Sequence, residues 1–218
     1  MSQNQPDGYL AVPSASTGIP VLVLHAWWGL NDTIKDVCER LADAGSIAFA
    51  PDLYHGKVAD TIPEAEALGK ALDANYLQAK AEIADATMFL NERADQAERG
   101  LAVIAFSLGA YYALDLAAAD PEHIRSVVLF YGTGPGDFSN SRAAYLGHFA
   151  EKDEFEPPSD VDHLEESLRR AGRPVTFYRY RGTGHWFFEP DRSDAYNQAA
   201  AQLAWERTVV FLRDVLSS

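Results

Sequence analysis

The sequence predicts an α/β fold in which helices cover both faces of a mostly parallel sheet. Short apolar runs without polar alternation recur along the chain, and such runs are typical of buried parallel strands. Segments with apolar residues at three- and four-residue spacing separate them, which is the pattern of amphipathic helices. Alternating strands and helices are joined by right-handed crossovers, and these place helices on both sides of a sheet.

Residues 1–218 are expected to form a single domain, because no linker, repeat or change of composition divides them. No run of about 18 apolar residues occurs, so we expect no membrane span. The first residues have neither a basic start nor an apolar core, which argues against a secretory signal. Cys38 is the only cysteine, so no intrachain disulfide is possible, and we expect a cytoplasmic protein.

The charge of the chain limits its partners. The formal net charge is −14, whereas nucleic acids and anionic membranes attract basic surfaces. We therefore expect neither as a partner. Such a charge more commonly serves solubility, and a small molecule is the expected partner.

The first half of the chain is predicted to alternate strands with helical segments. The expected strands are 9–12, 19–24 and 47–50, and the expected helical segments are 32–44 and 62–97, the latter a short helix followed by a longer one. Asp32 is the expected N-cap of the first helix. Cys38 lies on the apolar face of that helix, so we interpret it as a core residue.

The second half continues the same alternation. The expected strands are 101–106, 126–131, 143–149 and 175–180, and the expected helices are 108–119, 160–171 and 194–216. The glycine-rich residues 132–136 are not a phosphate loop, because they lack the lysine and the adjacent serine or threonine that would hold a nucleotide.

Ser107 stands between a buried strand and a helix. The local sequence is LAVIAFSLG, and its A-x-S-x-G pattern resembles the nucleophile elbow of hydrolases. An elbow serine has a strained backbone, so the residues two positions away must be small. Ala105 and Gly109 meet this requirement. Such short patterns also arise by chance, so partners elsewhere in the chain must support the interpretation.

Chemically active residues follow several predicted strands, where sites of parallel α/β sheets form. A serine needs a base to remove its proton, and the base needs an acid to orient it. Ser107, Asp153 and His185 occur in the chain order of α/β-hydrolases and are the expected nucleophile, acid and base. The alternatives for the acid are Glu151 and Glu154 and, more weakly, Asp160 and Asp162.

Other residues near the strand ends are candidates for binding. We expect the backbone amides of Trp27 and Leu108 to form the oxyanion hole. We expect Trp28, Tyr54 and Trp186 to line the substrate pocket, although one of the paired tryptophans is expected to be core packing. The histidines that could also contact substrate are His25, His55 and His148. No histidine pair has a zinc-ligand spacing, so no metal is expected.

At these motifs the chain resembles the dienelactone hydrolase family. The matching segments, in the order of the family, are HAWWGLN, APDLYHG, AFSLGA, AEKDEFEP, RGTGHWFF and AYNQAAAQLAWERTVVFL. The resemblance covers residues 20–213 and implies an α/β-hydrolase core without a large cap domain, acting on esters or lactones without a cofactor. It also implies the triad Ser107, Asp153 and His185 and the oxyanion amides of Trp27 and Leu108.

Two positions depart from the best-known members of the family. Those members have cysteine where this chain has Ser107, and glutamate where it has Ala26. In them the glutamate helps to activate the thiol, which a serine does not require. The expected function is therefore a serine hydrolase of small carboxylic esters or lactones, in a monomer or homodimer. The alternatives are a binding protein that has lost the chemistry and, less favoured, a lactonase that uses Cys38.

Overall fold

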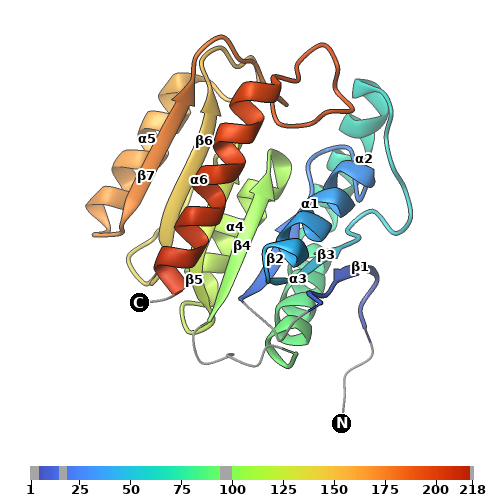
Figure 1. Cartoon of the computed structure of the whole chain (residues 1–218), viewed down its shortest axis with the longest axis vertical. Coiled ribbons are helices and arrows are strands. Elements are labelled where there is room, and N and C mark those ends of the chain that lie inside the picture. The colour runs from blue at the N-terminus through green and yellow to red at the C-terminus, as the bar shows by residue number, and fades with distance from the viewer. Residues whose placement is uncertain (1–4, 15–18, 94–99, 217–218) are drawn as a thin grey trace. The chain divides into compact units, whose positions relative to one another are not determined.

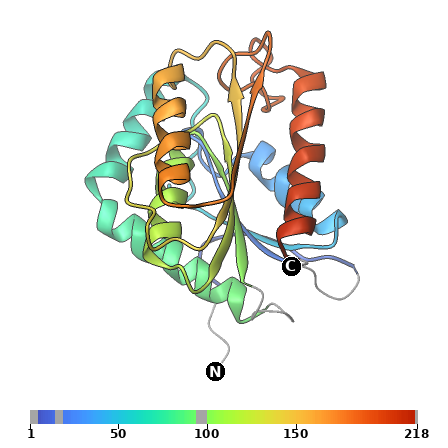
Figure 2. The same cartoon turned by 90° about the vertical axis from the view of Figure 1, so that its left-hand side faces the viewer.

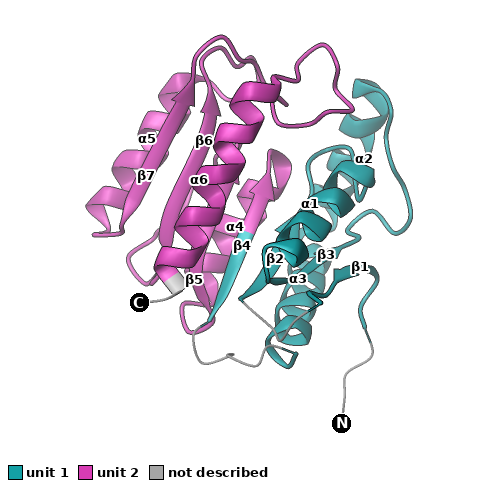
Figure 3. Cartoon of the chain, viewed as in Figure 1, with its two compact units in different colours: residues 1–103 teal, residues 104–218 magenta. Residues whose placement is uncertain are grey.

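The computed structural model describes residues 5–14, 19–93 and 100–216. The chain divides into two compact units, Met1–Val103 and Ile104–Ser218 (Figure 3). Strand β4 (Leu101–Phe106) begins in the first unit and ends in the second. The single domain expected from the sequence stays a prediction.

The first unit contains strands β1 (Gly8–Ala11), β2 (Pro20–Leu24) and β3 (Ile47–Pro51), in the order β1-β3-β2 (Figure 1). β3 pairs in parallel with β2 and antiparallel with β1, so that Val21 and Leu10 lie opposite Ala48 and Phe49. Every residue of β2 and β3 is buried, as their continuous apolar runs predict.

Three helices cover these strands on both sides. Figure 2 shows α1 (Asp32–Asp43) on one face and α2 (Ile62–Ala74) and α3 (Tyr76–Asn91) on the other. The expected helical segment 62–97 is therefore two helices, and its residues 94–97 lie outside the described part of the chain. Cys38 is buried on α1, as predicted.

The N-cap of α1 is Asn31, so the expectation of Asp32 is wrong. The Asn31 side chain accepts a hydrogen bond from the amide of Ile34 at 3.1 Å, whereas Asp32 lies in the first turn and pairs with Lys35. An acidic residue in the first turn interacts favourably with the helix dipole. Because Asn and Asp are adjacent and equally good caps, the sequence pattern does not distinguish them.

The second unit carries the carboxyl-terminal part of β4 together with β5 (Ile124–Phe130), β6 (Ala144–Ala150) and β7 (Val175–Tyr180), in that order. β5, β6 and β7 are parallel, and Phe130, His148 and Tyr178 lie side by side across them. Figure 2 shows α4 (Leu108–Ala119) and α5 (Pro158–Arg170) on one face and α6 (Gln198–Leu216) on the other. Parallel strands with helices on both faces confirm the predicted class.

Helix α6 begins at Gln198, four residues after the expected start. Residues 192–197 form a turn instead, in which the amides of Ala195 and Tyr196 both donate to the carbonyl of Arg192. The side chain of Asn197 then accepts from the amide of Ala200 at 3.1 Å, an arrangement typical of a helix start. Among the described helices, none is both long and apolar enough to cross a membrane.

Candidate active site

Ser107 lies at the turn from β4 into α4 with a strained backbone. Its φ is 46° and its ψ is −114°, a region that residues other than glycine rarely adopt. Its amide donates to the carbonyl of Phe130 at 2.9 Å, which ties the turn to the end of β5. The elbow interpretation predicts this strained backbone, and the hydrogen bond to β5 helps to maintain it.

Gly132 allows this turn to approach β5 closely. A Cβ at this position would overlap the carbonyl oxygen of Ser107 and would lie 2.6 Å from the Cβ of Ala110. The first of these is a backbone atom, so a side chain here would displace the elbow. Sequence patterns indicate only that residues 132–136 are not a phosphate loop, and they do not reveal this role of Gly132.

Replacing Gly132 with alanine should therefore disrupt the elbow. We expect a loss of stability of about 1–3 kcal/mol from overpacking and a larger relative loss of activity, because Ser107 itself must move. Thermal unfolding and ester turnover would measure the two effects. The matched control is Gly134→Ala, whose Cβ would first meet the flexible side chain of Leu114 at 3.3 Å. Equal activity in the two variants would contradict this role of Gly132.

His185 joins Ser107 to Asp153. Its Nε2 lies 2.9 Å from Ser107 Oγ, and its Nδ1 lies 2.9 and 2.8 Å from the two carboxylate oxygens of Asp153. The side chains of His185 and Asp153 are each only 4% exposed. The amides of Phe155 and Glu156 both donate to Asp153 Oδ1 at 2.9 Å, which fixes the carboxylate. The second unit thus brings together the three residues that the sequence selects.

The other acids considered from the sequence have different positions. Glu151 accepts a hydrogen bond from the amide of Gly182, and Asp162 pairs with Arg179. Asp160 accepts from the hydroxyl of Ser159, and Glu154 is exposed. None of these four carboxylates is hydrogen-bonded to His185 in the described contacts, whereas Asp153 is. The catalytic role of Asp153 stays a prediction.

Aromatic rings surround His185. The ring centroids of Tyr131, Phe155 and Trp186 lie 4.9, 5.0 and 5.0 Å from that of the imidazole. Trp186 has a φ of 63° and packs edge-on against the histidine. It is the one residue of the expected pocket lining that the second unit contains. Tyr131 and Phe155 were missed, because Tyr131 ends a predicted strand and Phe155 lies in the segment AEKDEFEP, and neither pattern indicates a contact with His185.

Glu156 is a further carboxyl group near the site. The hydroxyl of Thr133 donates to its Oε2 at 2.6 Å. Burial raises the pKa of Glu156, and its hydrogen bonds with Thr133 oppose that shift. This contact links the loop after β5 to the loop that carries Asp153. Both loops end parallel strands, so the side chains meet at one edge of the unit.

Of the remaining expected residues, Trp27, Trp28 and Tyr54 belong to the first unit and Leu108 belongs to the second. Trp28 is 2% exposed and is therefore the core tryptophan of the pair. Trp27 packs against Gly69 of α2, where a Cβ would lie 3.0 Å from the indole nitrogen. The oxyanion-hole role of the Trp27 amide stays a prediction. The amide of Leu108, in the second unit, is at the N-terminus of α4, where the helix dipole favours negative charge.

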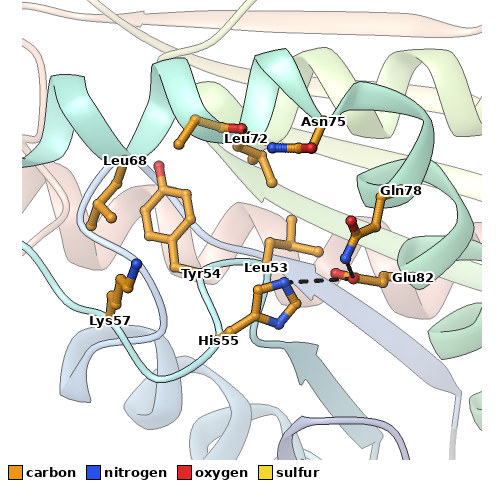
Figure 4. Close-up of a pocket in the computed structure, with 10 residues that line it drawn as sticks. Leu53, Tyr54, His55, Lys57, Leu68, Leu72, Asn75, Gln78 and Glu82 are labelled. Carbon is orange, nitrogen blue, oxygen red and sulfur yellow. Dashed lines mark hydrogen bonds and ion pairs between the residues drawn. The ribbon is translucent and has the colours of Figure 1, made fainter.

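Tyr54 lines a cavity of about 250 Å³ within the first unit. Figure 4 shows its ring beside Lys57 and Leu68, while His55 points toward Glu82 on α3. His55 Nε2 lies 3.6 Å from the Glu82 carboxylate, and His55 has a φ of 53°. The role of Tyr54 in substrate binding stays a prediction.

Two of the other candidate histidines are fully buried. His25 packs edge-on against Tyr54 with its Nδ1 2.8 Å from the carbonyl of Ala26. His148, on β6, is hydrogen-bonded to the hydroxyls of Tyr180 and Thr208, and burial lowers its pKa to about 3. His148 is therefore a buried histidine whose two ring nitrogens are both hydrogen-bonded within the second unit. No three His, Cys, Asp or Glu residues in the described ranges form a group that could hold a metal ion.

Comparison with known proteins extends over nearly the whole chain. The sequence model of the Dienelactone hydrolase family matches residues 7–216. "Protein usf" of Aquifex pyrophilus is 33% identical, covering 96% of this chain and 94% of that protein. A Bradyrhizobium protein named "Probable 2-oxo-3-(5-oxofuran-2-ylidene)propanoate lactonase" is also 33% identical, with coverages of 94% and 88%.

A solved structure has the same fold. The "Crystal Structure of Putative Dienelactone Hydrolase from Klebsiella pneumoniae subsp. pneumoniae MGH 78578" has a TM-score of 0.82 and 25% identity, covering 94% of this chain and 92% of that one. The fold and these similarities define the protein as an α/β-hydrolase. It belongs to the dienelactone hydrolase family and is a hydrolase of the esterase or lactonase type.

Proposed function

We propose that the protein hydrolyses small carboxylic esters or lactones with Ser107 as nucleophile. One observation carries this proposal: Ser107 Oγ, the His185 imidazole and the Asp153 carboxylate form a continuous hydrogen-bonded chain. The Asp153 carboxylate accepts a hydrogen bond from the Nδ1–H of His185, which leaves Nε2 of the neutral ring free to accept the Ser107 proton. The strained turn at Ser107 supports the same role, because strain is retained where function requires it.

The proposed reaction forms and then breaks an acyl-enzyme. Ser107 Oγ attacks the ester carbonyl while His185 Nε2 takes its proton. The tetrahedral intermediate collapses, the C–O bond to the leaving group breaks, and His185 returns the proton to the departing alkoxide. Water then attacks the acyl group while His185 takes one of its protons. The bond between the acyl carbon and Ser107 Oγ breaks, His185 returns the proton to Oγ, and the carboxylic acid leaves. Asp153 stabilises the imidazolium that forms in each step.

Backbone amides would stabilise the oxyanion. The Leu108 amide follows the nucleophile at the start of α4, and the Trp27 amide would supply the second hydrogen bond. Each such donor contributes about 2.7–4 kcal/mol in enzymes where one has been removed. Trp186, beside His185, would line the substrate pocket.

The choice of substrate class rests on family membership and on two residues. The Bradyrhizobium relative bears the name of a lactonase, which supports an ester or lactone substrate. Ser107 and Ala26 replace the cysteine and glutamate of the best-known members, which supports a serine mechanism. We also propose a cytoplasmic location, a small-molecule partner and no cofactor, in a monomer or homodimer.

A substrate panel tests the proposal. Short nitrophenyl esters, simple lactones and dienelactones would be incubated with the wild type and with Ser107→Ala. We expect the wild type to hydrolyse at least one class, and the variant to show the background rate. A protein that binds these compounds without turning any of them over would instead be a binding protein with a retained pocket. That result would overturn the proposal.

A further inference from the structure

We propose that Glu189 is a positioning residue for hydrolysis, acting through Tyr131 to hold the imidazole of His185 in line with Ser107. This inference rests on the proposed function, because it assigns a role to the support of the proposed base. Neither residue belongs to the hydrogen-bonded chain of Ser107, His185 and Asp153. Both lie within the second unit.

The two residues form a buried bridge. The hydroxyl of Tyr131 donates to Glu189 Oε1 at 2.6 Å, and both side chains are almost wholly buried. Tyr131 directly follows β5, whereas Glu189 lies four residues after His185. The bridge therefore joins the end of a strand to the loop that carries the base. A hydrogen bond between buried partners costs much more to break than an exposed one, because the remaining group stays desolvated.

Tyr131 transmits this restraint to the base. Its ring lies 4.9 Å from the His185 ring and also packs edge-on against Phe187. The phenol ring packs against the imidazole and would therefore restrict its rotation. Loss of the hydrogen bond to Glu189 would free the phenol ring and relax this restraint.

The backbone of Tyr131 is itself held in place. Its φ is 37°, which is unfavourable for a bulky residue, and its amide donates to the carbonyl of His148 at 2.8 Å. The next residue is Gly132, on which the Ser107 elbow packs. Two adjacent residues at the end of β5 thus support the proposed nucleophile and the proposed base.

Glu189 also stabilises its own loop through its backbone. Its amide donates to the carbonyl of Trp186 at 2.9 Å, and its carbonyl accepts from the amide of Arg192 at 3.0 Å. These bonds use backbone atoms, so they stay available when the side chain is replaced by glutamine or leucine. The side chain can therefore be changed without removing the turn that follows His185.

Burial favours the uncharged form of the Glu189 carboxyl. Burial raises the pKa of Glu189 to about 8; the hydrogen bond from Tyr131 and the charge of Arg192 oppose the shift, and Asp191 adds to it. Burial, with Glu189, Asp191 and Asp153 nearby, raises the Tyr131 pKa well above 10. A glutamine at position 189 would keep the acceptor oxygen for Tyr131. It is therefore the conservative substitution.

The raised pKa of Glu189 predicts that the stability of the protein depends on pH. The pKa of Glu189 in the folded protein, about 8, exceeds the ordinary value of 4.5, so the stabilisation by Glu189 is complete below about pH 4.5 and is lost as the pH rises through 8. Between pH 5 and 8, the urea midpoint of the wild type should therefore fall relative to that of Glu189→Gln. Parallel midpoints in the two proteins would show that Glu189 ionises normally.

The decisive test is steady-state kinetics at pH 7 on matched variants. Tyr131→Phe and Glu189→Leu should each lower kcat about 10- to 100-fold, the range expected for a misplaced catalytic group, with KM changed less than threefold. Glu189→Gln should recover most of that loss. The double variant Tyr131→Phe/Glu189→Leu should have a kcat only slightly below that of either single variant, because each substitution removes the same bridge.

The control is Tyr145→Phe. It also removes a buried tyrosine hydroxyl, which lies 2.7 Å from Ser141 Oγ, but at the start of β6. It should keep the wild-type kcat even if it lowers stability as much as Tyr131→Phe. Equal kcat in Tyr131→Phe and Tyr145→Phe, or a change in KM alone, would overturn the inference while the proposed function stands. A wild type no faster than Ser107→Ala would instead overturn both.

Discussion

Ser107→Ala should lower kcat for ester hydrolysis by about 10⁴- to 10⁶-fold, the range found when the nucleophile of a serine hydrolase is removed. Alanine lacks the oxygen that lies 2.9 Å from His185 Nε2, so no acyl-enzyme can form. Alanine is as small as serine and fits the strained turn equally well. The loss should therefore appear in kcat, with little change in the unfolding temperature. Turnover of the best substrate from the panel would measure it.

The matched control for this variant is Ser139→Ala. Ser139 is an exposed serine in the loop after β5, and its substitution should leave turnover within about twofold of the wild type. A Ser107→Ala variant with more than a tenth of the wild-type kcat would exclude Ser107 as the nucleophile.

Asp153→Asn should lower kcat about 10⁴-fold, by analogy with the corresponding substitution in another serine hydrolase. The amides of Phe155 and Glu156 require an acceptor at Oδ1, so the side-chain oxygen of asparagine should stay there. Its NH₂ group would then face His185 Nδ1 and hold the proton on Nε2. An imidazole protonated at Nε2 cannot accept the proton of Ser107.

Glu151→Gln is the control for Asp153→Asn. Glu151 is on the same loop, was a rival for the acid, and accepts only from the amide of Gly182 in the described contacts. Glutamine can replace it in that bond, so kcat should change by less than about threefold. If Glu151→Gln were the slower of the two variants, the acid would be assigned to the wrong residue. Circular dichroism would establish that both proteins are folded.

The sequence predicted well the strands and helices that carry Ser107, Asp153 and His185, because these elements depend on local patterns. The strand and helix around Ser107 lie where the apolar run and the small residues place them, at Leu101–Phe106 and Leu108–Ala119. Asp153 and His185 follow strands of one parallel sheet, so their order alone indicated that they would meet. Their catalytic roles remain predictions.

Contacts between segments that are distant in the sequence could not be predicted from local sequence patterns. Nothing in the letters around Tyr131 or Glu189 indicates their hydrogen bond, because it joins residues 58 positions apart. The sequence around Gly132 shows only that it does not form a phosphate loop. Its close approach to the backbone of Ser107 depends on the folded structure and leaves no sequence pattern. The start of α6 was placed too early, because a turn held by backbone bonds to Arg192 precedes Asn197.

The most direct test of the account is active-site labelling with a fluorophosphonate, which reacts with a serine that a neighbouring base activates. Mass spectrometry of the digested protein would locate the adduct. We expect one adduct per chain at Ser107 within minutes, much slower labelling in Asp153→Asn, and none in Ser107→Ala. Labelling at another residue, or a folded wild type that stays unlabelled at Ser107, would contradict the proposal that His185 and Asp153 activate this serine.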